Sequence, residues 1–186
     1  MGQRLPKGEV IMTGLGGSGI LTAGLVLASA AVSKYKNVTW FASYAISKLG
    51  GPVECTIIYS NEEISSPLLS RAEVVIIAES TQFKDFEGRV RPGGMMIIES
   101  AGFQDESKKE DFRIIKVPAI ETIVHTTGSS LGANLALLGA FVAATGSIPA
   151  ELIHSELEKS FASKEEVLKK SLRAFEEGRN MVAALI

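Results

Sequence analysis

Four glycines and a serine lie close together near the beginning of the chain. Gly14, Gly16, Gly17, Ser18 and Gly19 follow a short apolar run and precede a segment rich in Leu and Ala. This pattern is typical of a strand that turns tightly into a helix, because glycine adopts positive φ and lets the backbone approach a ligand or another segment. The free N–H groups and the dipole at the start of such a helix attract anions. The turn therefore suits the binding of a phosphate through the backbone.

The same glycines satisfy a dinucleotide-binding pattern only in part. Gly14, Gly16 and Gly19 give G-x-G-x-x-G. The usual partner is an acidic residue about 20 positions later, which binds the ribose hydroxyls. No Asp or Glu occurs between Glu9 and Glu54. The sequence therefore favours a turn kept for packing, for another phosphate or for a partner subunit over dinucleotide binding.

A second group of small and turn-forming residues follows the predicted strand 38–43. It includes Ser43, Tyr44, Gly50 and Gly51. Because α/β folds bind ligands at the carboxyl ends of strands, these residues are candidates to lie beside the glycine turn and face a ligand or partner. A long connection without a ligand explains the same residues, and the sequence leaves both interpretations open.

The remaining reactive residue types do not assemble into a recognisable site. Cys55 is the only cysteine, so the chain forms no internal disulfide and cannot alone supply the roughly four thiolates of an iron–sulfur cluster. It is interpreted as a small buried side chain. His125 and His154 lack the spacing of a zinc site. We assign no catalytic residue and no metal ligand.

The composition is that of one globular domain over residues 1–186. Hydrophobic residues make up 46% and charged residues 22%, and the net charge of −2 argues against general nucleic-acid binding. No segment resembles a signal peptide, and the longest apolar run, 135–145, is shorter than the 18 or more residues of a membrane span. We expect a cytoplasmic protein that does not enter a membrane.

The hydrophobic pattern predicts an α/β fold. After the first strand–helix unit, which ends near Val32, strands are expected at 38–43, 53–60, 73–80, 95–99 and 112–118, with a turn at 91–94. Helices are expected at 83–90, at 131–145, from Pro149 onward, and after a capping box formed by Ser163 and Glu166. The predicted fold is a single three-layer α/β/α domain with a mainly parallel or mixed sheet and a Rossmann-like first βα unit.

The predicted helix 131–145 is rich in Gly and Ala on its surface. Small residues allow another element to approach closely, so this helix is expected inside the core or at a subunit contact.

Several motifs occur in order along the chain. They are 14–24, with Ser18 at a position where Gln is usual; Ser43-Tyr44 followed by Gly50-Gly51 and Cys55; 64–67; 91–94; 117–119; and 134–140. In this order the chain resembles the gamma subunit, or gamma domain, of the 2-oxoacid:ferredoxin oxidoreductases, a family that includes the pyruvate, 2-oxoglutarate and 2-oxoisovalerate enzymes. The loop at 43–51 lacks the Glu and Arg that many members have there.

The resemblance implies a role inside a complex. Such complexes decarboxylate a 2-oxo acid on thiamine diphosphate, pass electrons through iron–sulfur clusters to ferredoxin and transfer the acyl group to coenzyme A. The thiamine diphosphate and the clusters are expected on alpha-, beta- and delta-type partners, and this chain alone is expected to bind none of these cofactors and to be inactive. It would help to assemble the complex near coenzyme A. The expected cofactor-facing residues are Gly14, Gly16, Gly17, Ser18, Gly19, Ser43, Tyr44, Gly50 and Gly51.

Two alternatives belong to other classes of function. One is a free-standing nucleotide- or coenzyme-A-binding domain, which predicts micromolar or better binding by the isolated chain. The other is a pure interaction module, which predicts no ligand and a large apolar contact face that includes the helix 131–145.

Overall fold

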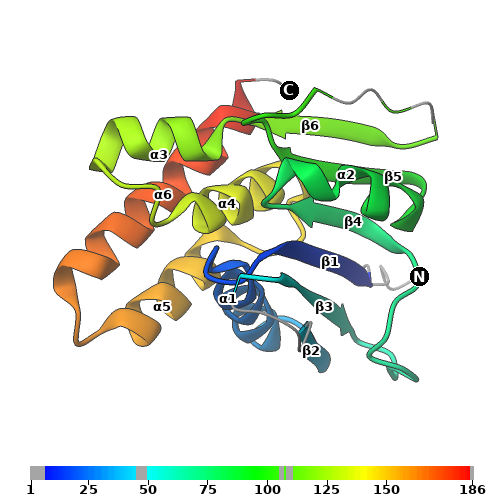
Figure 1. Cartoon of the computed structure of the whole chain (residues 1–186). Coiled ribbons are helices and arrows are strands. Elements are labelled where there is room, and N and C mark those ends of the chain that lie inside the picture. Colours follow the sequence, from blue (N-terminus) through cyan, green and yellow to red (C-terminus); the bar gives the residue numbers. More distant parts are fainter. Residues whose placement is uncertain (1–6, 45–49, 105–106, 108–110, 185–186) are drawn as a thin grey trace.

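The computed structural model describes residues 7–44, 50–104, 107 and 111–184 (Figure 1). The strands are β1 (Gly8–Leu15), β2 (Asn37–Tyr44), β3 (Pro52–Ser60), β4 (Ala72–Ile77), β5 (Val90–Glu99) and β6 (Arg113–Val117). The helices are α1 (Ile20–Val32), α2 (Phe83–Phe86), α3 (Ala119–Thr127), α4 (Ala133–Thr145), α5 (Ala150–Phe161) and α6 (Glu165–Ala183). Two short 3-10 turns, Ser80–Gln82 and Glu87–Arg89, flank α2.

The described strands form one mixed sheet in the order β2-β3-β1-β4-β5-β6. The strands β1, β4, β5 and β6 are parallel, whereas β3 is antiparallel to both of its neighbours. The α/β fold with a mixed sheet is therefore confirmed. The antiparallel part is a β2–β3 hairpin, which follows the first βα unit in the sequence and forms one edge of the sheet beside β1.

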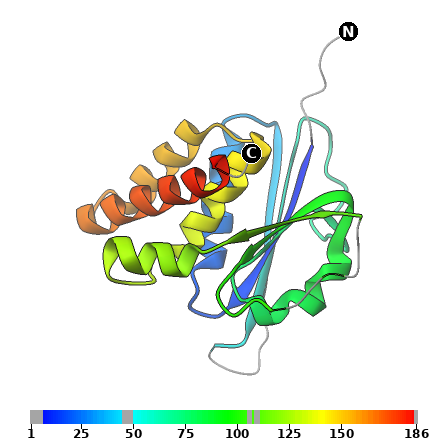
Figure 2. The same ribbon diagram turned by 90° about the horizontal axis from the view of Figure 1, so that it is seen from above.

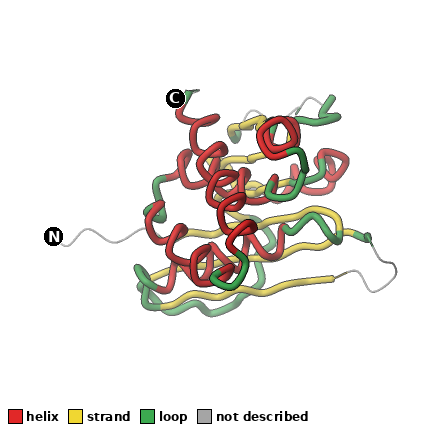
Figure 3. Tube along the Cα trace, turned by 90° about the vertical axis from the view of Figure 1, so that its left-hand side faces the viewer, coloured by secondary structure: helices red, strands yellow, loops and turns green. Residues whose placement is uncertain are grey.

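The two faces of the sheet are covered unequally. Helices α1, α3, α4, α5 and α6 lie on one face, and α2 with its flanking turns lies on the other (Figure 2). Figure 3, seen from the helical side, shows the large helical layer in front of the strands. Alternation along β1 sends Val10 and Met12 into the large core and Ile11 into the smaller one. The three predicted layers are present, and the helical layer on one side is much the thicker.

The Gly- and Ala-rich helix α4 packs against α6 inside the chain. Residues 135–142 are all buried. A Cβ on Gly139 would lie 2.0 Å from the carbonyl oxygen of Phe175, and one on Gly178 would lie 1.8 Å from that of Ala136. The small residues therefore serve a helix–helix contact within the core. The apolar contact face expected of an interaction module is wrong for this helix, because its own chain already covers it.

The predicted turn at 91–94 is wrong, since these residues lie within β5. Gly93 has a φ of 77°, and a Cβ on Gly94 would lie 2.6 Å from the carbonyl oxygen of Glu73. The pairing of β4 with β5 shifts register between Ala72 and Val74. The glycines thus form a bulge in the strand rather than its beginning.

The ends of three helices also differ from the sequence expectation. The capping box is wrong, because Lys164 occupies the N-cap of α6 and no side chain caps that helix. The helix predicted at 83–90 is only four residues long in α2, and the strand begins at Val90. Helix α3 was not predicted; the carboxylate of Glu99 accepts hydrogen bonds from the backbone N–H groups of Ala101 (2.8 Å) and Ile120 (2.9 Å), and the latter lies in the first turn of α3.

Candidate functional site

The glycine turn joins β1 to α1 and needs glycine for its backbone conformation. Gly17 has a φ of 95° and Gly19 a φ of 75°. The backbone N–H of Ser18 donates to the carbonyl of Leu15 (3.0 Å), and its hydroxyl lies 3.4 Å from the backbone nitrogen of Ile20. A Cβ on Gly17 would meet no atom within 4 Å. Gly17 is therefore required by its φ angle and leaves open space above the turn.

One side of the turn is closed by packing. A Cβ on Gly14 would lie 2.9 Å from the hydroxyl of Ser18 and 3.1 Å from Cβ of Ala78. The N–H of Gly16 donates to the carbonyl of Gly51 (2.8 Å). Gly14 thus lets the side chains of Ser18 and Ala78 pack against the end of β1, and Gly16 lies against the backbone of Gly50 and Gly51. Little room is left for a ligand on this side.

The structure brings together only part of the predicted loop and the glycine turn. Gly50 and Gly51 contact Gly16. Ser43 and Tyr44 belong to β2, which β3 separates from β1, and adjacent strands lie about 4.8 Å apart. Residues 45–49, between these two groups, lie outside the described residues. The loop meets the turn through its two glycines, and Ser43 is an exposed residue of the edge strand.

The glycine turn lies between two neighbouring parallel strands whose following helices cover opposite faces of the sheet. From β1 the chain passes to α1 on the thick helical face, and from the neighbouring parallel strand β4 it passes to α2 on the other face. Open α/β sheets bind ligands at such a switch point. The position of the turn agrees with a ligand-binding role.

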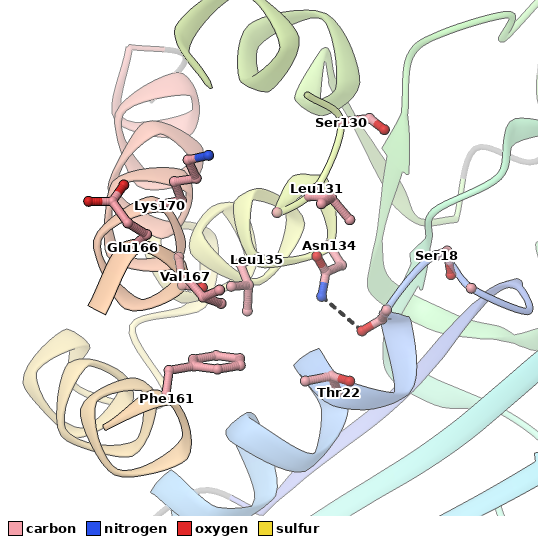
Figure 4. A pocket seen from close by; sticks show the side chains of 14 residues that line it. Ser18, Thr22, Ser130, Leu131, Asn134, Leu135, Phe161, Glu166, Val167 and Lys170 are labelled. Carbon is pink, nitrogen blue, oxygen red and sulfur yellow. Dashed lines mark hydrogen bonds between the residues drawn. The ribbon is translucent and has the colours of Figure 1, made fainter. Parts of the chain in front are cut away.

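The other side of the turn opens into a cavity of about 420 Å³ (Figure 4). The side-chain amide of Asn134 donates to the carbonyl of Gly19 (2.8 Å), so that the first turn of α4 is tied to the N-cap of α1. The wall comes from the glycine turn, α1, the beginning of α4, the end of α5 and the first two turns of α6. Its residues are Gly17, Ser18, Gly19, Thr22, Ser130, Leu131, Gly132, Asn134, Leu135, Phe161, Glu166, Val167, Lys170 and Ser171.

Sequence reasoning found the first wall of this cavity and missed the others. The wall residues of α5 and α6 follow the glycine turn by more than 140 positions. Asn134 was the one available signal, because it is a polar residue at the start of an apolar helix.

The cysteine, the histidines and the buried Glu99, which lie outside the turn, are placed as parts of the core or of the surface and do not form a reactive site. Cys55 is 0% exposed, and burial raises the pKa of its thiol to about 12, so it is not a nucleophile. His125 is exposed, and His154 lies 2.6 Å from the carboxylate of Glu176 at the surface. Burial raises the pKa of the Glu99 carboxyl, and the hydrogen bonds that tie Glu99 to α3 act in the opposite direction.

The described residues contain neither a metal-binding cluster nor a membrane-spanning helix. No group of three or more His, Cys, Asp and Glu side chains is placed to hold a metal ion. None of the helices described combines the length and the apolar character needed to cross a bilayer.

The family model of pyruvate ferredoxin/flavodoxin oxidoreductase matches residues 9–181. The chain belongs to this family. It is 33% identical over 172 residues to the ketoisovalerate oxidoreductase subunit VorA of Methanothermobacter marburgensis, covering 91% of this chain and 35% of VorA. It is 31% identical over 173 residues to the 2-oxoglutarate synthase subunit KorC of Archaeoglobus fulgidus, covering 93% of this chain and 89% of KorC.

A solved family structure has the same fold. The 2-oxoglutarate:ferredoxin oxidoreductase of Magnetococcus marinus, with 2-oxoglutarate, coenzyme A and succinyl-CoA bound, superposes with a TM-score of 0.88 at 21% identity. The superposition covers 100% of this chain and 32% of that one. The chain thus spans about a third of VorA and of this enzyme chain, and nearly all of KorC.

Proposed function

We propose that the chain is the gamma part of a 2-oxoacid:ferredoxin oxidoreductase. The complex would oxidatively decarboxylate a 2-oxo acid, form an acyl-CoA and reduce ferredoxin. The family match over residues 9–181 carries this proposal. The match to KorC, over 93% of this chain, supports the gamma role.

The chemistry itself is assigned to the partners. The single cysteine cannot supply the roughly four thiolates of an iron–sulfur cluster, so the clusters would reside on other subunits. The resemblance to the gamma subunits likewise assigns the clusters and thiamine diphosphate to alpha-, beta- and delta-type partners. The chain alone is proposed to be inactive and cytoplasmic. Coenzyme A bound to the Magnetococcus marinus enzyme supports a place for this domain near coenzyme A.

Within the chain, we assign the glycine turn to the phosphates of coenzyme A. Gly17, Ser18 and Gly19 present the start of α1, whose first turn has no acidic residue. Free N–H groups and a positive helix end suit a phosphate. Gly14 and Gly16 shape the turn, Gly50 and Gly51 support it, and Ser43 and Tyr44 are assigned to contact with coenzyme A or a partner subunit.

The complex is tested by purifying the untagged chain at its native level and identifying what co-elutes. We expect subunits that carry thiamine diphosphate and iron–sulfur clusters, and coenzyme-A-dependent reduction of ferredoxin with pyruvate, 2-oxoglutarate or 2-oxoisovalerate. A chain that elutes alone and binds coenzyme A or a dinucleotide at micromolar concentration would instead be a free-standing binding domain.

The assignment of the turn is tested in the assembled complex by Gly17→Asp. The carboxylate would repel a phosphate at the start of α1, so we expect the KM for coenzyme A to rise about tenfold with an unchanged KM for the 2-oxo acid. Gly146→Asp is the matched control, since Gly146 also has positive φ (59°) and no atom within 4 Å of a Cβ. Equal effects of the two changes would contradict the assignment.

A further inference from the structure

Strand β2 forms one edge of the described sheet, and it is a regular, uncharged strand. It is eight residues long, contains no charged residue and no proline, and pairs with β3 at every position without a shift of register. Alternate residues of an antiparallel edge strand direct their N–H and C=O groups away from the sheet. Natural edge strands are normally short, charged or bulged, because a free edge pairs with another strand. Among the described strands, β2 is therefore open to strand addition.

The opposite edge of the sheet, at β6, is protected. Strand β6 is only five residues long, and two of its side chains, Arg113 and Lys116, are charged and exposed. Short length and charged side chains are the usual means by which a protein prevents pairing at an edge. The two edges of the same sheet thus differ, and the difference indicates that β2 is the edge that pairs.

Helix α1 extends the uncharged surface beside β2 (Figure 1). No charged residue occurs between Glu9 and Lys34, so the whole helix lacks charge. Leu25 and Val32 are seven positions apart and lie on the same side of the helix, where they are 49% and 65% exposed. The outer side of a helix in a globular protein normally carries charged and polar residues. Exposed Leu and Val on an uncharged helix indicate a surface that another protein covers.

Helix α1 and strand β2 contribute to one surface. A Cβ on Gly24 would lie 3.2 Å from Nε1 of Trp40, so the helix lies over the strand. Trp40 and Phe41 are the two central residues of β2, and their side chains point to opposite faces of the sheet. Trp40 is partly buried, and Phe41 is 43% exposed. Aromatic side chains without charged neighbours are typical of the centre of a protein–protein interface.

We propose that β2 pairs with β2 of a second copy of this chain. The two strands run antiparallel about a twofold axis close to Trp40 and Phe41, so that the two six-stranded sheets join into one. The two α1 helices then meet on the same face of the joined sheet through Leu25 and Val32. This interface goes beyond the proposed function and does not depend on it.

The distribution of charge favours a second copy as the occupant. A twofold axis places a surface against itself, and a surface without charge then meets no like charge. Lys36 immediately precedes β2, and antiparallel pairing places the two Lys36 residues at opposite ends of the interface, about 27 Å apart for an eight-residue strand. That distance exceeds the Debye length of roughly 8 Å at physiological ionic strength, so the two cations do not oppose pairing. The short, charged strand β6 of another copy would fit β2 less well.

The test is sedimentation velocity of the full 186-residue chain at about 1 to 100 μM, where we expect a monomer–dimer equilibrium. Phe41→Lys places two ammonium groups near the twofold axis and should weaken the dimer at least about tenfold. Val124→Lys is the matched control, because Val124 is 44% exposed but lies on α3, at the end of the sheet opposite to β2 (Figure 1). Circular dichroism shows whether each variant is folded. Leu25→Lys, on α1, should weaken the dimer without a change in the sheet and replaces Phe41→Lys if that variant unfolds.

A mixture of two variants tests the twofold pairing itself. Phe41→Glu alone should dimerise as weakly as Phe41→Lys. An equimolar mixture of the two should dimerise at least about tenfold more tightly than either alone, because opposite charges then face each other across the axis. A mixture of Val124→Lys and Val124→Glu should show no such gain.

Three results would overturn the proposal. The first is an unmodified chain that stays monomeric over the whole concentration range, and the second is Phe41→Lys and Leu25→Lys dimers that are as tight as that of Val124→Lys. The third is a mixture of the two Phe41 variants that dimerises no more tightly than either alone. If β2 amides of a monomer become protected from hydrogen exchange only with co-purified partners, another subunit occupies the edge and the proposal is also wrong. The proposed function is judged separately, by whether partner subunits co-elute.

Discussion

Helices α4 and α6 meet in two different ways along their length. At Gly139 and Gly178 their backbones touch so closely that a single Cβ would overlap a carbonyl oxygen. At their beginnings the same helices part, and Leu135, Val167 and Ser171 line a cavity instead. The small residues that stand out in the sequence therefore mark packing. The candidate site lies where the helices separate, among residue types that are ordinary in any helix.

The closed contact is most directly broken by Gly178→Ala. The new Cβ would lie 1.8 Å from the carbonyl oxygen of Ala136, which belongs to a backbone and cannot rotate away. Overfilling a core typically costs about 1–3 kcal/mol, and we expect Gly178→Ala to lower the free energy of unfolding by at least that much. Urea unfolding measures this loss. Lys169→Ala on the exposed side of α6 should stay within about 0.5 kcal/mol. An unchanged midpoint for Gly178→Ala would show that the two helices are not in contact.

The close packing of α1 against the sheet can be measured through the reactivity of Cys55. A Cβ on Gly24 would lie 2.5 Å from its sulfur, so the helix covers the thiol. With a pKa of about 12 in place of roughly 8.5, the thiolate at pH 8 is about a thousandfold scarcer in the folded chain than in the unfolded one.

Iodoacetamide labelling should therefore be at least that much slower in buffer than in urea at pH 8. In the folded chain the rate should rise with pH up to the raised pKa, because the folded state holds its proton more tightly. Rapid labelling of the folded chain would mean that α1 does not cover Cys55.

Asn134→Ala tests the hydrogen bond that joins α4 to the start of α1 beside the cavity. The change removes the 2.8 Å hydrogen bond to Gly19 and leaves a half-buried carbonyl without that donor. We expect a loss of about 1–2 kcal/mol in the free energy of unfolding. Asn180→Ala is the control, since Asn180 is exposed on α6. If both variants lose the same stability, the link between α1 and α4 contributes nothing.

The smallest effect is expected inside the cavity, from Ser171→Ala. Its hydroxyl has no partner among the described residues, so its removal should change stability by no more than about 0.5 kcal/mol and in the stabilising direction, since Ala favours helix. Ser80 is equally buried, at 6% exposed, but donates to the carbonyl of Ala101 (2.8 Å). Ser80→Ala should cost about 1 kcal/mol. A loss at Ser171 as large as at Ser80 would indicate a hydrogen bond within the protein.

Much of the fold follows from local patterns in the chain. The apolar run before the glycine turn predicts β1, and the near-continuous apolar run of β4 predicts a strand in the middle of the sheet, where the structure has it. The bulge at Gly93 and Gly94 did not follow, because glycines that start a turn and glycines that bend a strand look alike in sequence. Helix α3 was missed because its end is held by Glu99, which is 20 residues away from Ala119.

The sequence by itself determined the glycine turn, its need for positive φ, the α/β class and the resemblance to the gamma subunits, since each depends on residues close together in the chain. Only the tertiary structure decided which side of the turn is open. Gly51, just before β3, closes one side because its carbonyl accepts a hydrogen bond from the N–H of Gly16, and α4, α5 and α6 leave a cavity on the other. The physical reason is that packing depends on how helices far apart in the sequence cross each other. A helix can contact its neighbour at one turn and diverge from it at the next, while its residue pattern stays the same along its whole length.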